Sequence, residues 1–315
     1  MKFHVAHQVP KLPFTINHKD TVFLTGSCFA ENMALKMEDL RFRVERDPAG
    51  ILFNPESMGI SLENILNQTS PNDYALIERE GLWYSYFHHS KIHAGSRVQL
   101  KQYILGKQVL AIKALQSAAL LVISFGTAFV YKHRKLKMVV GNCHKQPQQD
   151  FEKILLMPGD ITERYLDLIL KLRKLNPDLQ ILFTVSPVKY LRDGLEQNAL
   201  SKASLLLATH KLVQSFEFCH YFPAYELLND DLRDHRFYKE DLAHPNDLAI
   251  QYIWEKFSGS VFGEKTLALN AEIKKLNDAL KHRETEGSDI SRQKHQVFIE
   301  EQKRRIQMLD SNIAV

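Results

Sequence analysis

The feature that most constrains the fold is a series of short apolar runs that alternate with longer helical patterns. Residues 119–125 (ALLVISF) and 180–185 (QILFTV) are largely apolar, as is typical of strands that are covered on both faces. We expect two further strands at residues 21–25 and 218–222. Strands that alternate with helices indicate a parallel sheet with helices on both sides. The predicted fold class is therefore α/β.

The same pattern suggests how the chain is divided. Residues 1–262 are predicted to form one α/β domain, in which residues 38–118 are a large insertion and a candidate lid. Residues 263–315 are rich in charge and contain few strong core residues, so we expect a helical appendage there. This appendage either packs on the body or mediates self-association into a homo-oligomer. Helices are expected at residues 30–37, 151–156, 161–175, 199–217, 247–257, 271–282 and 291–309.

Composition argues against several classes of protein. The 315 residues include 41 basic and 37 acidic side chains, an excess that is small and spread along the chain. We therefore expect no nucleic-acid partner, because such proteins usually concentrate basic charge on one face. The longest apolar run, near residues 118–125, is too short to span a bilayer, and the N-terminus lacks the apolar core of a signal peptide. These features predict a cytoplasmic protein without a membrane span.

The cysteines point away from a disulfide framework or a metal site. Cys28, Cys143 and Cys219 are few, odd in number and without metal-ligand spacing. His88 and His89 are candidate substrate contacts. No third residue follows them at a spacing typical of metal ligands. We therefore expect neither a metal nor another cofactor.

Small and polar residues follow three of the predicted strands. Gly26-Ser27-Cys28, Gly126-Thr127 and Ser186-Pro187 each begin where a strand ends. Because ligands of parallel α/β sheets bind outside the carboxyl ends of the strands, this edge is predicted to form a pocket rim.

Two distant segments carry the residue types of an acyl-transfer site. The first is the strand-to-helix turn at Ser27 and Cys28, which brings a hydroxyl and a thiol to the positive end of a helix. The second is Asp241 with His244, a carboxylate three residues before an imidazole that it can orient as a general base. A nucleophile on such a turn and an oriented base are the equipment of covalent acyl transfer. The plainer interpretation makes Ser27 a helix cap and His244 an ordinary loop histidine.

Further residues are candidates for an oxyanion hole or a substrate pocket. The backbone N–H of Gly126, with Thr127 beside it, follows the strongest predicted strand. Asn142 is a candidate second donor and His144 a candidate pocket residue, although both equally suit a role in holding a loop.

Several spaced motifs resemble one protein family. The resemblance covers roughly residues 20–257, leaves out the charged tail, and is to the GSCFA family, which is related to the SGNH or GDSL-like hydrolases. The motifs that carry it are Gly26-Ser27-Cys28-Phe29-Ala30, residues 50–55 (GILFNP), residues 125–128 (FGTA), residues 142–145 (NCHK), residues 186–188 (SPV) with 191–194 (LRDG), and residues 236–238 (RFY) through His244-Pro245.

The resemblance implies a three-layer fold of flavodoxin type and a Ser–His–Asp site with glycine and asparagine oxyanion donors. Asp241 and His244 match the late Asp-x-x-His-Pro block of that family. Gly126 matches the block that normally reads Gly-x-Asn-Asp, but residues 126–129 read GTAF, so the usual asparagine is absent. Asn142 and Asn54 are candidate replacements.

The resemblance leaves the nucleophile open between two neighbouring residues. The superfamily block Gly-Asp-Ser places the nucleophile two positions after glycine, which is Cys28 in this chain, whereas a turn shifted by one residue would present Ser27. We favour Ser27, because Cys28 and Phe29 are candidates for the core.

Three functional hypotheses remain. The first is a hydrolase or acyltransferase for an O-acyl ester of a sugar, a lipid or a small alcohol. The second is a non-catalytic binding protein, which the missing asparagine favours. The third is an assembly protein that associates through its C-terminal helices.

Overall fold

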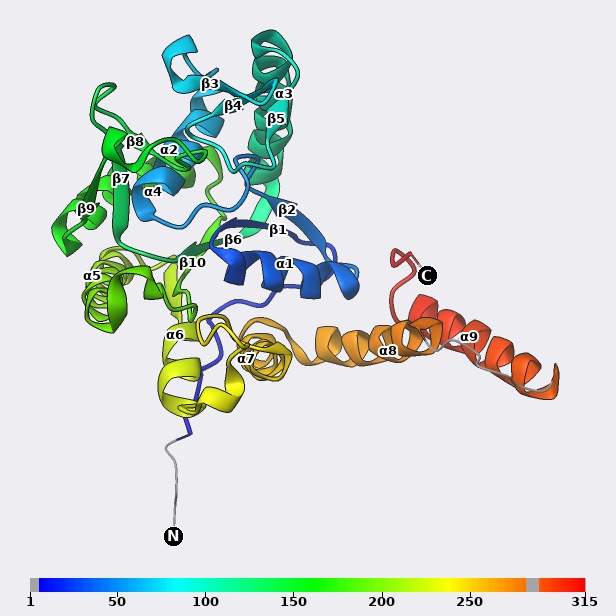
Figure 1. The fold of residues 1–315 in the computed structure, drawn as a ribbon. Coiled ribbons are helices and arrows are strands. Elements are labelled where there is room, and N and C mark those ends of the chain that lie inside the picture. Colours follow the sequence, from blue (N-terminus) through cyan, green and yellow to red (C-terminus); the bar gives the residue numbers. More distant parts are fainter. Residues whose placement is uncertain (1–5, 282–288, 315) are drawn as a thin grey trace.

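The central sheet has five parallel strands. The computed structural model describes residues 6–281 and 289–314. The strands stand in the order β11-β10-β6-β1-β2 (Figure 1), which is the 2-1-3-4-5 order of flavodoxin-like folds when they are numbered along the chain. This confirms the predicted α/β class. The strands are β1 (Thr21–Gly26), β2 (Arg43–Arg46), β6 (Ala118–Phe125), β10 (Gln180–Val185) and β11 (Cys219–Phe222).

Successive residues of a strand point to opposite sides of the sheet. Both faces of this sheet carry apolar side chains, and helices cover both faces. In β6, Leu120 and Val122 belong to one buried cluster, whereas Leu121, Ile123 and Phe125 belong to the other. The first cluster packs beneath α1 (Cys28–Asp39) and α7 (Asp247–Val261), near the short helix α6 (Ala224–Glu226). The second packs beneath α2 (Pro55–Asn67), α3 (Arg97–Ser117), α4 (Pro158–Leu175) and α5 (Gly194–Ser215).

Residues 151–156 do not form the predicted helix. They contribute β9 (Phe151–Leu155), which pairs antiparallel with β7 (Phe129–His133) in a small sheet that also contains β8 (Val139–Val140). A short apolar run has no periodicity that separates strand from helix. Here pairing with β7 and burial of Phe151 beside Tyr86 and Val140 select the strand.

Residues 38–118 do not form a single inserted unit. β2 is an edge strand of the central sheet, while α2 and α3 belong to one of its covering layers. The part that stands outside these layers is a small antiparallel sheet of β3 (Leu76–Arg79), β4 (Leu82–Ser85) and β5 (His93–Ala94). This sheet packs on α3 through Leu100 and Ile104. A lid role for it remains a prediction.

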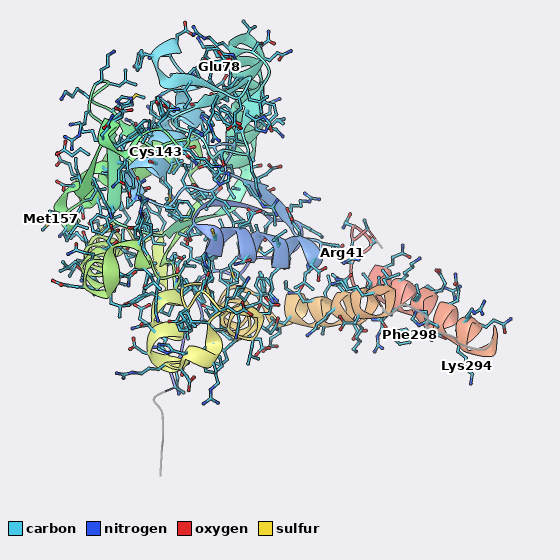
Figure 2. All side chains as sticks on the ribbon, viewed as in Figure 1. Arg41, Glu78, Cys143, Met157, Lys294 and Phe298 are labelled. Atoms are coloured by element: carbon cyan, nitrogen blue, oxygen red, sulfur yellow. The ribbon has the colours of Figure 1, made fainter. Side chains whose placement is uncertain are left out.

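The charged tail forms two helices, α8 (Glu264–Lys281) and α9 (Asp289–Leu309). The pair extends away from the sheet (Figure 1) and carries Lys294 and Phe298 on its far part (Figure 2). It is nevertheless joined to the body, because Leu269 and Ile273 belong to the same buried cluster as α1. Arg41, two residues after the end of α1, also donates to Asn277 Oδ1 over 2.7 Å. Self-association through the tail remains a prediction.

The predicted end of the first tail helix, His282, lies outside the described residues. Across residues 6–281 and 289–314, no helix has the length and apolar character needed to cross a membrane.

Candidate active site

The turn after β1 is held tightly against the neighbouring strand β6. Gly26 has a φ of +128°, and a Cβ there would lie 2.3 Å from the carbonyl oxygen of Ser124, so only glycine fits this turn. Ser27 then donates its N–H to the same oxygen over 3.1 Å. The chain enters α1 at Cys28, next to the end of β6.

Ser27 and Cys28 have different surroundings. Ser27 is the N-cap of α1, is 2% exposed, and accepts a hydrogen bond from Phe29 N over 3.2 Å. Its hydroxyl also lies 2.9 Å from Ser124 Oγ. Cys28 is partly exposed, and its thiol has no hydrogen bond to another residue that the structure describes. Phe29, by contrast, is buried in the core. Partial burial raises the pKa of the Cys28 thiol.

His244 is oriented by the carboxylate three residues before it. Its Nδ1 lies 2.6 Å from Asp241 Oδ2, and Asp241 Oδ1 accepts the N–H groups of Ala243 and His244. These backbone bonds, with the imidazole, lower the pKa of Asp241 to about 2, so the carboxylate is ionised and Nδ1 carries the proton. Nε2 makes no hydrogen bond within the described chain, which leaves its lone pair available.

One cavity joins these two segments. It has a volume of about 240 Å³, and Ser27, Cys28 and His244 all line it. Residues more than two hundred positions apart in the sequence therefore line one cavity. Ser27 and Cys28 reach it from the carboxyl end of β1, and His244 reaches it from the turn before α7. The remaining lining residues come from the loops after β2, β6 and β10: Phe53, Gly126, Thr127, Ser186, Val188, Lys189 and Tyr190.

The backbone N–H of Gly126, a predicted oxyanion donor, is already bonded in this structure. This N–H and that of Thr127 both donate to the carbonyl oxygen of Phe53, each over 2.8 Å. Glycine is needed here for close approach, because a Cβ would lie 2.9 Å from that oxygen and 3.3 Å from Ser27 Cβ. The Thr127 hydroxyl lines the cavity but already bonds Ser201 Oγ over 3.1 Å.

Asn54 and His89 lie close to the site without lining this cavity. Asn54 is buried and caps α2 by accepting Ser57 N over 2.8 Å, while its amide nitrogen has no partner among the residues described. His89 lines a second hollow of about 170 Å³, which shares Ser27 with the first and also contains Lys91. Burial lowers the pKa of His89.

Asn142 and His144 lie outside both hollows. Asn142 accepts His144 N over 2.8 Å, and His144 Nε2 lies 2.8 Å from the carbonyl oxygen of Ser85. The His144 ring packs against Tyr84 and is buried, which lowers its pKa. Because the segment follows β8 of an outer antiparallel sheet, the convergence of parallel strand ends does not bring it to the site. Both residues hold a loop, which is the plainer of the two predicted roles.

The sequence did not predict two kinds of residue that line or support the cavity. Phe53 and Tyr190 supply apolar walls, yet an aromatic residue in a loop gives no signal on its own. Lys202, fully buried on α5, gives a clearer signal, because it is a lysine on a helix whose neighbouring turns are apolar. No cluster of three or more potential metal ligands occurs in the described part of the chain.

Comparison with known proteins places the chain in a family. The sequence model of the GSCFA family matches residues 21–257, so the chain belongs to the GSCFA family. No curated protein sequence matches it.

Three similar solved structures share little sequence with this chain. A putative GDSL-like lipase from Parabacteroides merdae is 12% identical with a TM-score of 0.41, and the match covers 80% of this chain and 98% of the lipase. An acetyl xylan esterase from Butyrivibrio proteoclasticus is 10% identical (TM-score 0.40, 79% of this chain and 64% of that one). A carbohydrate esterase of family 3 from Talaromyces cellulolyticus is 11% identical (TM-score 0.36, 80% and 99%).

Proposed function

We propose that this protein is an ester hydrolase or O-acyltransferase in which Cys28 attacks the acyl carbon and His244 moves the protons. One observation carries the proposal: the thiol at the start of α1 and the imidazole bound to ionised Asp241 line the same cavity of about 240 Å³.

Cys28 is a better nucleophile than Ser27 in this geometry, although the sequence favoured Ser27. The Ser27 hydroxyl is buried and caps a helix, so an attack would require it to leave both Phe29 N and Ser124 Oγ. The Cys28 thiol is partly exposed and does not have to break such bonds. Because burial raises its pKa, the thiol stays largely protonated at neutral pH and depends on a base.

The reaction proceeds in two balanced steps. His244 Nε2 takes the proton from Cys28 as sulfur bonds to the ester carbonyl carbon. The carbon–oxygen bond then breaks, and the alcohol leaves with that proton from His244. The product is a thioester on Cys28. Water, or a second alcohol in the transferase, then attacks the thioester and gives its proton to His244, which returns it to the sulfur.

The developing oxyanion has two candidate donors. The backbone N–H of Cys28 opens α1, where the first amides have no partner in the helix and the dipole favours negative charge. The amide nitrogen of Asn54 is the second candidate. Asn54 does not itself line the cavity, but it follows the lining residue Phe53, and this donor has no partner among the described residues. These groups would replace the N–H of Gly126.

The cavity surroundings favour an ester with a small acyl group and a polar alcohol. Phe53, Val188 and Tyr190 give the cavity an apolar wall. Lys189 is shared with an open hollow of about 570 Å³ that is lined by charged and polar side chains, including Arg233 and Asp230. A hydroxyl-rich alcohol such as a sugar suits that hollow, because each hydroxyl finds a charged hydrogen-bond partner.

The test is alkylation by iodoacetamide followed by mapping of each cysteine, together with labelling by a fluorophosphonate probe. Cys143 and Cys219 are internal controls, because burial raises their pKa to about 11 and about 12. Cys28 should react first, and His244→Ala should slow its reaction without changing the controls. Fluorophosphonate on Ser27 would instead make the serine the nucleophile.

A non-catalytic binding protein is the second candidate function. It is favoured by the N–H of Gly126, which is fully engaged with Phe53 in place of an open donor. In that case Cys28 would react no faster than Cys143, no serine would be labelled, and neither result would depend on His244.

A further inference from the structure

One face of α5 carries three buried polar residues next to the cavity. Asn198, Ser201 and Lys202 are spaced i, i+3 and i+4, so they lie side by side on the helix. Lys202 is 1% exposed, and the next turns on this side, Leu205 and Ala208, are apolar core. Buried polar side chains have to find hydrogen-bond partners within the protein. Those partners show which segments this face of α5 fixes in place.

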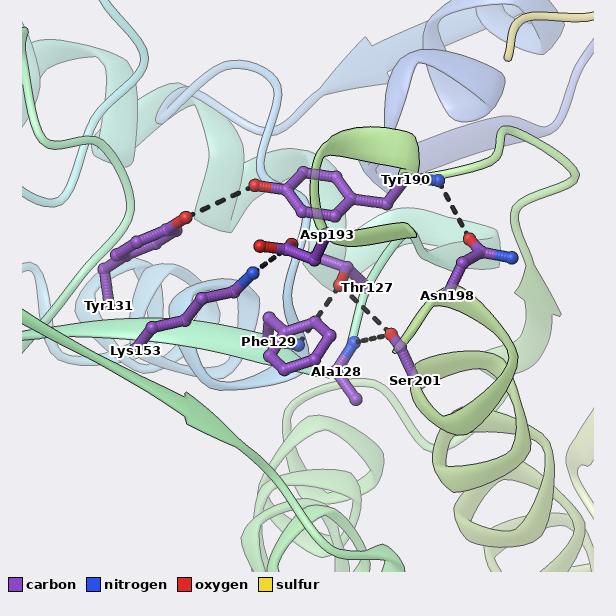
Figure 3. Close-up of polar contacts among 9 residues, drawn as sticks. All are labelled: Thr127, Ala128, Phe129, Tyr131, Lys153, Tyr190, Asp193, Asn198 and Ser201. Carbon is purple, nitrogen blue, oxygen red and sulfur yellow. Dashed lines mark hydrogen bonds and ion pairs between the residues drawn. The ribbon is translucent and has the colours of Figure 1, made fainter. Parts of the chain in front are cut away.

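Two of the three residues hold backbone of loops that line the cavity. Asn198 Oδ1 accepts Tyr190 N over 2.8 Å, and Ser201 Oγ accepts Ala128 N over 2.8 Å (Figure 3). Ser201 also bonds the hydroxyl of Thr127. Tyr190 belongs to the loop after β10, whereas Thr127 and Ala128 follow β6. α5 therefore fixes segments on two neighbouring strands.

Lys202 joins these two segments by itself. Its Nζ donates to the carbonyl oxygens of Gly126 and Ser186, each over 2.7 Å. Neither oxygen accepts another hydrogen bond from the described residues. Both residues line the cavity with Cys28 and His244.

The burial of Lys202 is costly in free energy, and no carboxylate offsets it. Within residues 6–281 and 289–314 this lysine forms no ion pair, and desolvation lowers its pKa to about 7. An apolar side chain would fill a helix face at lower cost, but it would leave two buried carbonyls without donors. A lysine at position 202 therefore stabilises the two loops through these hydrogen bonds and contributes less to the packing of the core.

The loop that Lys202 and Asn198 hold also supports the catalytic base. Lys189 N donates to the carbonyl oxygen of Ala243 over 3.0 Å, directly before His244. The outer end of the same loop is tied by the ion pair of Lys153 with Asp193 (Figure 3). A displacement of residues 186–190 would therefore also move Ala243 and the neighbouring His244.

We propose that Lys202, with Asn198 and Ser201, is a positioning residue that clamps the loops after β6 and β10 and so sets the geometry between Cys28 and His244. Its catalytic consequence rests on the proposed function, but the clamp itself is independent of turnover.

The test compares Lys202→Met with Lys211→Met by amide hydrogen exchange. Lys211 is an exposed lysine on the same helix and serves as the matched control. In Lys202→Met, peptides covering residues 125–129 and 186–190 should exchange at least about ten-fold faster, while α1 and α4 keep their rates. Lys211→Met should change neither. Unchanged exchange in both loops, or an equal increase throughout the molecule, would overturn the clamp.

Activity separates failure of the clamp from failure of the proposed function. With ester turnover present, Lys202→Met should lower kcat/KM by about 10²-fold, chiefly through kcat, as expected from a displaced catalytic group, while Cys28 remains open to alkylation. If the unaltered protein shows no turnover but the two loops still loosen in the variant, the clamp stands and the proposed function falls.

A measurement on the unaltered protein covers the case in which Lys202→Met does not fold. In a sample with 15N-labelled lysine, one side-chain nitrogen should carry slowly exchanging protons with couplings across hydrogen bonds to two backbone carbonyls. Absence of any such protected lysine signal would contradict the proposal.

Discussion

Two glycine segments end neighbouring parallel strands, and they leave very different groups free. At Gly26–Cys28 the turn is fixed by Ser124, yet neither the thiol of Cys28 nor its backbone N–H bonds another residue of the described chain. At Gly126–Thr127 the N–H groups bond Phe53, the hydroxyl bonds Ser201 and a carbonyl bonds Lys202. In the proposed reaction the first segment supplies the reacting groups, whereas the second, with its polar groups already bonded, forms a wall of the cavity.

The largest effect is expected at the first segment. Cys28→Ala should lower ester turnover by about 10⁵-fold, since it removes the attacking atom. Steady-state kinetics with p-nitrophenyl acetate measures this loss, and Cys143→Ala is the control that should keep full activity. Turnover that survives in Cys28→Ala and disappears in Ser27→Ala would reverse the assignment of the two neighbours.

The next effect concerns the group that orients the base. Asp241→Asn should lower kcat by about 10³-fold, because the amide no longer fixes the Nδ1–H tautomer of His244. As the pKa of Asp241 is about 2, the carboxylate stays ionised at any pH well above that value. Protonation of Asp241 itself should therefore not change the rate of the unaltered protein from about pH 5 upward, and kcat of the two proteins is compared at one pH in this range. An Asp241→Asn protein that keeps nearly full kcat would argue for another role of Asp241.

A substitution in the segment Gly126–Thr127 should mainly lower the free energy of unfolding. Gly126→Ala forces a Cβ to 2.9 Å from the Phe53 carbonyl oxygen and 3.3 Å from Ser27. We expect a loss of about 3 kcal/mol in the free energy of unfolding, measured by urea denaturation. Gly159→Ala is a suitable control, because a Cβ there meets nothing within 4 Å. Equal stability of the two variants would mean that the wall is not tightly packed.

The smallest effect is expected for the serine that the sequence favoured. Ser27→Ala removes the cap of α1 and the contact with Ser124, which should reduce the free energy of unfolding by about 1–2 kcal/mol. Activity should stay within about ten-fold of the unaltered protein, since the hydroxyl does not attack. Thermal unfolding and kinetics on the same sample compare the two effects directly.

The sequence could predict the residues that parallel topology brings together. Continuous apolar runs indicated the buried strands, and the end of β1 located Ser27 and Cys28 at the edge of the sheet. His244 lies in a turn between β11 and α7 and was singled out by its spacing from Asp241. The bounds of β1 and β10 differ little from those expected. For the residues that directly follow a strand, the convergence of carboxyl ends was the physical rule behind the prediction.

The remaining features depend on contacts that no local pattern encodes. β9 forms a strand because it pairs with β7. Asn142 lies outside the site because it follows β8, a strand of the outer sheet. The N–H of Gly126 is occupied by Phe53, a residue of a distant loop. Burial of Lys202 on α5 likewise depends on the carbonyls of Gly126 and Ser186, which follow β6 and β10.

The most direct test of the account is the detection of an acyl group on Cys28. The protein is mixed with p-nitrophenyl acetate, quenched in acid within the first turnovers and digested for mass spectrometry. We predict an acetylated peptide that contains Cys28, is released by neutral hydroxylamine, as thioesters are, and is absent from His244→Ala. An acetyl group on Ser27 alone, or none on either residue while turnover continues, would contradict the account.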